Sequence, residues 1–386
     1  MKRILFALSL MAATTASFAQ VAKPMEDVNK VIDNTADSLN KAMTARIQPG
    51  TSRKGNNPVL FLIGNSTMRN GTLGNGNNGQ WGWGYYEHEF FDANKITVEN
   101  QALGGMSSRT FYNRLWPDVR KGIKAGDWVI ISIGHNDNGP YDSGRARASI
   151  PGIGKDSLNV TIRETGVKET VYTYGEYMRK YINDCKSLGA HPILMSLTPC
   201  DAYDENDKIV RVNKTFGLWA KQVAEQEHVP FVDLNEISAA KLDSYGHWKE
   251  KYHFFKDHIH TSRFGAMMNA RSAAEGLAES KDPNLAPLQA MMINVALPTE
   301  DFKREPGKPV VFFTGDSTVK NADKDEDGMW GWASQAYTIF NPKKITCVNA
   351  AKAGRSSRSY LNEGRWDKVY NSLQPGDYVL IEFGHN

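Results

Sequence analysis

Short apolar runs alternate with longer amphipathic stretches from Pro58 onward. Runs that are apolar throughout predict buried strands, and a 3.6-residue period predicts helices. On this basis we expect strands over 59–63, 96–102, 128–133, 192–197 and 230–234, with helices over 84–91, 110–121, 170–188, 212–227 and 262–279. Apolar strands separated by helices indicate an α/β fold with a parallel sheet covered on both faces. Functional sites in such folds lie beyond the carboxyl ends of the strands.

The opening pattern returns about 250 residues later. "GNST" at 64–67 matches "GDST" at 315–318, "WGWG" at 81–84 matches "WGWA" at 330–333, and "IGHN" at 133–136 matches "FGHN" at 383–386. This period is far too long for a solenoid repeat and indicates a duplicated globular domain. The second copy stops after its third predicted strand, so we interpret the sequence as an incomplete fragment. The predicted divisions are a signal peptide (1–19), a lead-in (20–57), a complete domain (58–281), a linker (282–308) and an incomplete second domain (309–386).

The first residues predict export. Lys2 and Arg3 precede an apolar stretch, and small residues at positions 17 and 19 form a cleavage site after Ala19. We therefore expect a periplasmic or extracellular protein, with no integral membrane segment once the signal is removed. The net charge of +3, without a basic run, provides no argument for a nucleic-acid partner. Oligomeric state is left open by the sequence.

Three cysteines, an odd number, exclude a full disulfide framework. A bridge between Cys185 and Cys200 is conceivable, but small buried hydrophobes are the favoured interpretation.

Several residues that could take part in catalysis follow the predicted strands. Ser66 follows the first strand, Gly105 the second and Asn136 the third, and "FFKDHIHTSRFGA" supplies Asp257 and His260 late in the domain. A serine on a turn after a strand is a candidate nucleophile. It is also a common helix N-cap, and "GNST" alone favours that interpretation. The i, i+3 spacing of the aspartate and histidine allows the carboxylate to orient the imidazole toward the serine.

The blocks "IGNST", "NQALGGMSS", "GHND" and "DHIH" resemble the SGNH (GDSL-like) hydrolase superfamily. "GRARASIPGIG" and "ETVYTYGEYMRKYI" resemble its rhamnogalacturonan acetylesterases more narrowly. The resemblance implies a three-layer α/β/α, flavodoxin-like fold and a serine esterase that needs no cofactor. Its implied substrate is an acetylated polysaccharide and, within that class, the rhamnogalacturonan of pectin. The implied catalytic residues are Ser66 (nucleophile), His260 (base) and Asp257 (orienter), with an oxyanion hole formed by Ser66, Gly105 and Asn136.

The resemblance has one departure. Asn65 stands where the family has the aspartate that the second copy retains as Asp316. That aspartate is not a member of the triad, so activity is still expected, with altered local hydrogen bonding. The second copy has counterparts at Ser317, Gly354 and Asn386, but the only histidine after His260 is His385, in the "GHN" block. We expect this copy, as given, to be inactive.

Other residues have competing interpretations. His258 competes with His260 as the base, and family spacing favours His260. Arg109 either binds a substrate carboxylate or is an ordinary solvated arginine. Trp81 and Trp83 either stack on sugar rings or, as we favour, pack against the sheet. We expect no metal site, since Asp257 and its neighbouring histidines lack further ligands.

The alternatives to a pectin acetylesterase are an esterase acting on another polysaccharide or lipid ester, and a non-catalytic carbohydrate-binding relic. The loop over 137–168 is expected to shape the substrate cleft.

Overall fold

The computed structural model describes residues 46–69, 76, 79–246, 250–295, 302–320, 330–336 and 339–386. The predicted signal peptide and residues 20–45 of the lead-in lie outside this part of the chain. The chain divides into two compact units, one comprising residues 1–86 and 96–272 and the other residues 87–95 and 273–386.

The first unit is built on a five-stranded parallel sheet. Its strands are β1 (Val59–Gly64), β2 (Thr97–Asn100), β3 (Trp128–Ser132), β6 (His191–Met195) and β7 (Phe231–Val232). Their order is β2-β1-β3-β6-β7, and every neighbouring pair is parallel. This confirms the predicted α/β class, and it is the flavodoxin-like order, in which the chain starts beside the middle strand and winds outward in both directions.

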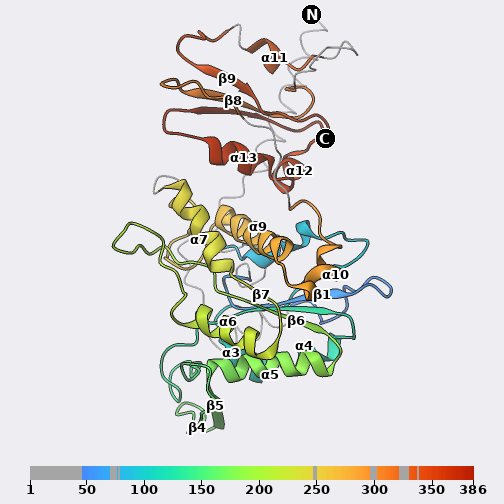
Figure 1. The fold of residues 1–386 in the computed structure, drawn as a ribbon, viewed down its shortest axis with the longest axis vertical. Coiled ribbons are helices and arrows are strands. Elements are labelled where there is room, and N and C mark those ends of the chain that lie inside the picture. The colour runs from blue at the N-terminus through green and yellow to red at the C-terminus, as the bar shows by residue number, and fades with distance from the viewer. Residues whose placement is uncertain are drawn as a thin grey trace, which may run out of the picture. The chain divides into compact units, whose positions relative to one another are not determined.

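Helices cover both faces of the sheet (Figure 1). On one face lie α3 (Ser108–Arg114), α4 (Trp116–Gly122), α5 (Tyr174–Ser187) and α6 (Phe216–Glu227). Their buried side chains form one apolar cluster with alternate residues of the central strands, among them Phe61, Ile63 and Ile131. On the other face lie α7 (Leu234–Tyr245) and the start of α9 (Arg263–Glu279). The three-layer prediction is therefore confirmed.

Several predicted boundaries were wrong. The helix expected over 110–121 is two helices, α3 and α4, and Pro117 lies in the first turn of α4, where its missing N–H costs nothing. The helix expected over 84–91 is two 3₁₀ helices, Trp83–Tyr85 and Glu87–Phe90. Helix α5 begins after its N-cap Thr173 rather than at 170. Helix α7 was not predicted.

The loop over 137–168 contains regular structure. Its second part, with the residues that follow, forms an antiparallel hairpin of β4 (Ser157–Thr161) and β5 (Lys168–Tyr172). This hairpin projects beyond α5, away from the sheet (Figure 1). The first part of the loop bonds to residues near the strand ends, through Asp137 and Arg147.

The second unit contains a three-stranded parallel sheet of β8 (Val310–Gly315), β9 (Thr346–Asn349) and β10 (Tyr378–Glu382) in the order β10-β8-β9. Its helices are α10 (Ala286–Gln289), α11 (Ala333–Ala336), α12 (Ser357–Asn362) and α13 (Arg365–Ser372), with a 3₁₀ turn at Pro283–Leu285. This order matches β3-β1-β2 of the first unit, so the sequence repeat is also a repeat of topology.

Candidate active site

Ser66 lies on a tight turn immediately after β1. The turn is closed by the N–H groups of Met68 and Arg69, which both donate to the Asn65 carbonyl, at 3.2 and 2.9 Å. Gly64 makes room for it, because a Cβ there would come within 3.0 Å of the Met68 side chain and the Ser132 carbonyl. Ser66 is half-buried. It is thus held at the carboxyl end of the central strand with part of its surface open to solvent.

The structure brings Ser66, His260 and Asp257 into one hydrogen-bonded chain. His260 Nε2 lies 2.8 Å from Ser66 Oγ, and His260 Nδ1 lies 2.7 Å from Asp257 Oδ2. The His260 and Asp257 side chains are 23% and 39% exposed. Residues 194 positions apart in the sequence therefore meet at the surface, as the family resemblance implied.

Asp257 is fixed by bonds other than its bond to the imidazole. Its Oδ1 accepts from the backbone N–H groups of Ile259, at 2.9 Å, and His260, at 2.7 Å, while Gln80 Nε2 donates to Oδ2 at 3.3 Å. Partial burial alone would raise the pKa of Asp257, but the hydrogen bonds from His260 and Ile259 outweigh it and lower that pKa. The carboxylate is thus held ionised against the ring. Nothing in the sequence pattern pointed to Gln80.

The backbone around His260 is tied to two neighbouring segments. The Trp81 N–H donates to the Thr261 carbonyl at 2.9 Å, and Thr261 Oγ1 donates to the Trp81 carbonyl at 2.6 Å. The Asp201 N–H donates to the His258 carbonyl at 2.7 Å. The His258 side chain is exposed, and no bond joins it to Ser66 among the described residues. His260, not His258, is therefore the histidine that the fold brings to the serine.

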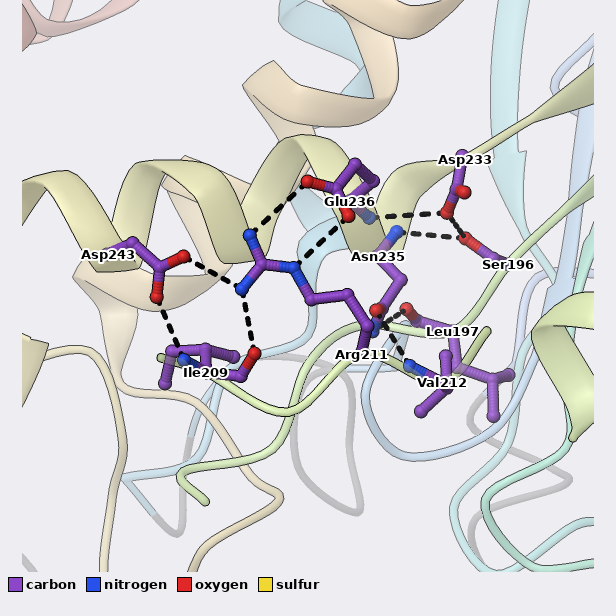
Figure 2. A network of polar contacts seen from close by, with 9 residues as sticks. All are labelled: Ser196, Leu197, Ile209, Arg211, Val212, Asp233, Asn235, Glu236 and Asp243. Atoms are coloured by element: carbon purple, nitrogen blue, oxygen red, sulfur yellow. Dashed lines mark hydrogen bonds and ion pairs between the residues drawn. The ribbon is translucent and has the colours of Figure 1, made fainter. Parts of the chain in front are cut away.

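The loop that carries Asp201 is itself anchored to α7 (Figure 2). Arg211 bonds to Glu236 and Asp243 of that helix, and the Asn235 side chain bonds to the Val212 N–H and the Leu197 carbonyl. Ser196 at the end of β6 donates to Asp233, the N-cap of α7. The unpredicted helix thus supports one of the segments that hold the His260 backbone.

Gly105 and Asn136 lie close to one another, although the strands that they follow, β2 and β3, are separated by β1 in the sheet. Asn136 Nδ2 donates to the carbonyl of Met106, next to Gly105, at 2.9 Å. Gly105 has φ +78°, a conformation that favours glycine, and a Cβ on Gly104 would lie 3.7 Å from Ser66 Cβ. The turn after β2 therefore packs against Ser66, and one amide hydrogen of Asn136 is left for a further acceptor.

Asn65 has hydrogen bonding different from that of Asp316, as the sequence led us to expect. In both copies Oδ1 accepts from the threonine two residues later. Asp316 Oδ2 also accepts from the His385 N–H at 3.4 Å, whereas the buried Asn65 Nδ2 finds no partner among the described residues.

His135, the counterpart of His385, has a structural contact. Its Nε2 lies 3.1 Å from the Thr198 carbonyl. Burial, with a smaller contribution from nearby His260, lowers the pKa of His135 to about 4. The ring is therefore neutral at pH 7 and adds no positive charge beside the catalytic candidates.

Neither interpretation offered for Arg109 was right. Its side chain is fully buried, with Nε and Nη2 on Glu169 at 2.8 Å and Nη1 on the carbonyls of Tyr141 and Ala148. Because these bonds occupy its guanidinium, Arg109 is not solvated and cannot bind a substrate carboxylate. It joins α3 to the 137–149 loop and to the hairpin.

Trp83 is 0% exposed, so it packs in the core and is not a sugar-stacking residue. Trp81 is half-buried beside Tyr85 and Tyr86, with the Arg263 guanidinium 5.8 Å from its ring centroid. Through its backbone bonds to Thr261, Trp81 also positions the segment that follows His260.

All three cysteines are free, so the conceivable bridge between Cys185 and Cys200 does not form. No cluster of three or more potential metal ligands occurs among the residues described.

In the second unit, Ser317 is exposed, and Gly354, with φ +72°, repeats the conformation of Gly105. His385 Nδ1 lies 3.4 Å from Asp316 rather than beside Ser317.

Comparison with known proteins agrees with this geometry. The model of the GDSL-like lipase/acylhydrolase family matches residues 60–270, over half of the chain. The chain belongs to this family. It is therefore a serine esterase of the SGNH type, and its relatives place it in the rhamnogalacturonan acetylesterase branch.

Two of those relatives and one solved structure illustrate the similarity. A rhamnogalacturonan acetylesterase of Emericella nidulans is 28% identical over 213 residues, 55% of this chain and 81% of the relative. The "Probable rhamnogalacturonan acetylesterase YesY" of Bacillus subtilis is 31% identical over 228 residues, 57% and 92% of the two chains. The crystal structure of the B. subtilis protein YxiM has a TM-score of 0.46 at 26% identity, covering 57% of this chain and 56% of that one. The similarity to the two rhamnogalacturonan acetylesterases shows that the protein is a carbohydrate esterase. No helix among the described residues is long and apolar enough to cross a membrane.

Proposed function

We propose that this esterase removes O-acetyl groups from pectin, on the rhamnogalacturonan backbone, through an acyl-enzyme formed on Ser66. The observation that supports it most is the continuous chain from Ser66 through His260 to Asp257, with distances of 2.8 and 2.7 Å. The two relatives named for rhamnogalacturonan support the choice of substrate.

The geometry suggests a role for each group. His260 Nε2 accepts the Ser66 proton as Oγ attacks the acetyl carbonyl, and Asp257 stabilises the imidazolium that results. The N–H groups of Ser66 and Gly105 and the free amide hydrogen of Asn136 bind the oxyanion. His260 then protonates the departing sugar oxygen. Water, deprotonated by the same imidazole, releases acetate and regenerates the serine.

Acetate release from acetylated rhamnogalacturonan oligosaccharides tests the proposal, with acetylated xylan and a lipid ester as comparison substrates. We expect the highest kcat/KM on rhamnogalacturonan and loss of activity in Ser66→Ala. A fluorophosphonate probe should label Ser66 in the wild type. Sugar binding without labelling would instead support a non-catalytic relic. A preference for xylan or lipid would retain the mechanism and change the substrate.

We also propose that the protein is exported, on the strength of the pattern in residues 1–19. Expression of the full chain in a bacterial host, followed by N-terminal sequencing of the exported fraction, should give a mature chain that begins at Gln20. An uncut chain retained in the cytosol would contradict this.

A further inference from the structure

Arg147 lies beside the turn that follows β2. Its Nη1 donates to the Gly105 carbonyl at 3.3 Å. The N–H of the same glycine is a proposed oxyanion donor, and the adjacent Met106 carbonyl receives Asn136. The guanidinium therefore contacts the same residue that carries a proposed oxyanion donor. A guanidinium has five N–H donors, and this contact uses one of them.

The segment around Arg147 is held in place by the rest of the unit. The Ala148 carbonyl accepts from buried Arg109, the Ser149 N–H donates to the Asp137 carbonyl at 3.1 Å, and the Ile150 N–H donates to Tyr172 at 2.9 Å. Arg147 itself is half-buried, so its charge is partly desolvated, and burial together with neighbouring Arg145 lowers its pKa. The fold therefore fixes the backbone on both sides of Arg147 and keeps its guanidinium partly removed from water.

This cation and its neighbour have no direct ion-pair partner in the part of the chain that the structure describes. Among the residues described, neither Arg145 nor Arg147 forms an ion pair, and Arg145 is exposed. The acid whose charge acts on Arg147 is Asp137, but that side chain is buried and accepts from Ser108 N and Oγ and from Ser149 Oγ.

Two other acids of the 137–168 loop also have partners. Asp142 pairs with Arg163, and Glu164 accepts from the Gly144 N–H. Two guanidinium groups two residues apart, with no ion-pair partner among the described residues, attract an external anion.

We infer that Arg147, assisted by Arg145, binds the carboxylate of a uronate sugar on or next to the acetylated residue. The planar fork of a guanidinium matches a carboxylate through two parallel hydrogen bonds. This inference rests on the proposed function for the position of the ester, and it transfers to Arg147 the role that the buried Arg109 cannot play. It predicts that the enzyme distinguishes substrates by charge and not only by shape.

Binding tests the inference without turnover. In a Ser66→Ala background, titration calorimetry would compare a deacetylated rhamnogalacturonan oligosaccharide with the same oligosaccharide whose carboxyl groups are methyl-esterified. Adding Arg147→Gln should weaken binding of the acidic form about 10- to 100-fold, and Arg147→Lys by less. Added salt should weaken binding of the acidic form in the parent and much less in Arg147→Gln. Equal affinities with and without Arg147, or an equal loss on both oligosaccharides, would overturn the inference.

Kinetics provides the second measurement, as the ratio of kcat/KM on acidic and methyl-esterified acetylated oligosaccharides. A ratio is independent of the fraction of folded enzyme. Arg147→Gln should lower it about 10- to 100-fold through KM, and Arg145→Gln by less. Lys155→Gln, which removes an exposed positive charge from the same loop, should leave it unchanged. An unchanged ratio in Arg147→Gln would refute charge recognition. Acetate release that survives Ser66→Ala would instead refute the proposed function, and the binding measurement would still decide the role of Arg147.

Discussion

Replacement of Asp257 by asparagine changes one atom in the hydrogen-bonded chain. Asp257 Oδ1 accepts from two backbone N–H groups at 2.9 and 2.7 Å, and Oδ2 lies 2.7 Å from His260 Nδ1. Asparagine retains the first two bonds through its oxygen and places an NH₂ group opposite the imidazole. Two donors cannot face one another, so the ring must take the tautomer in which Nδ1 accepts.

That tautomer carries its proton on Nε2, 2.8 Å from Ser66 Oγ, and cannot accept the serine proton. The same switch in other serine hydrolases lowers kcat by about 10⁴-fold, and we expect a loss of this order here. It corresponds to about 5 kcal/mol of transition-state stabilisation. Because both backbone bonds survive and the side chain is 39% exposed, the free energy of unfolding should change by less than about 1 kcal/mol.

The assay is hydrolysis of an aryl acetate, with urea unfolding of the same preparations. Asp257→Ala is the matched comparison. It should lose a similar factor in kcat and in addition about 1–3 kcal/mol of stability, because the N–H groups of Ile259 and His260 lose their acceptor. If Asp257→Asn kept more than about a tenth of wild-type kcat, Asp257 would not set the tautomer, and the proposed mechanism would be wrong.

Three further predictions concern Asn136, Arg109 and Asp137. Asn136→Ala should lower kcat by about 10²–10³-fold with little change in KM; an unchanged kcat would remove it from the oxyanion hole. Arg109→Met should lower the free energy of unfolding by about 2–4 kcal/mol in urea titrations, because one buried carbonyl, one partly buried carbonyl and a carboxylate lose the donors of Arg109; a change below about 1 kcal/mol would contradict that role. Burial raises the pKa of Asp137 from 3.8 to about 6, against opposing hydrogen bonds from Ser108 and Ser149. Stability from this group is therefore complete below pH 3.8 and is lost as the pH rises through 6, so wild type should lose about 1 kcal/mol between pH 5 and 7.5 relative to Asp137→Asn; parallel profiles would contradict it.

The parallel sheet and the positions of the main candidates could be predicted because they depend on local pattern. Runs such as 59–63 can be buried only in a sheet with two covered faces. A strand order that brings β2, β1 and β3 together places the residues after them at one edge. The meeting of Ser66 and His260 was implied by the family resemblance, since spacing alone does not show which of two histidines turns inward.

Tertiary packing decided what local pattern leaves open. Arg109 is buried because Glu169 and two carbonyls surround it, and these partners are 32 to 60 positions distant along the chain. The hairpin that provides Glu169 has only one buried residue in its two strands, Val171, so no apolar period predicted it. The unpaired charge of Arg147 has the same origin, because whether an arginine has a counter-ion depends on which carboxylates the fold brings near. Apolar periodicity reports burial along one segment, whereas the partner of a charge is a property of several segments at once.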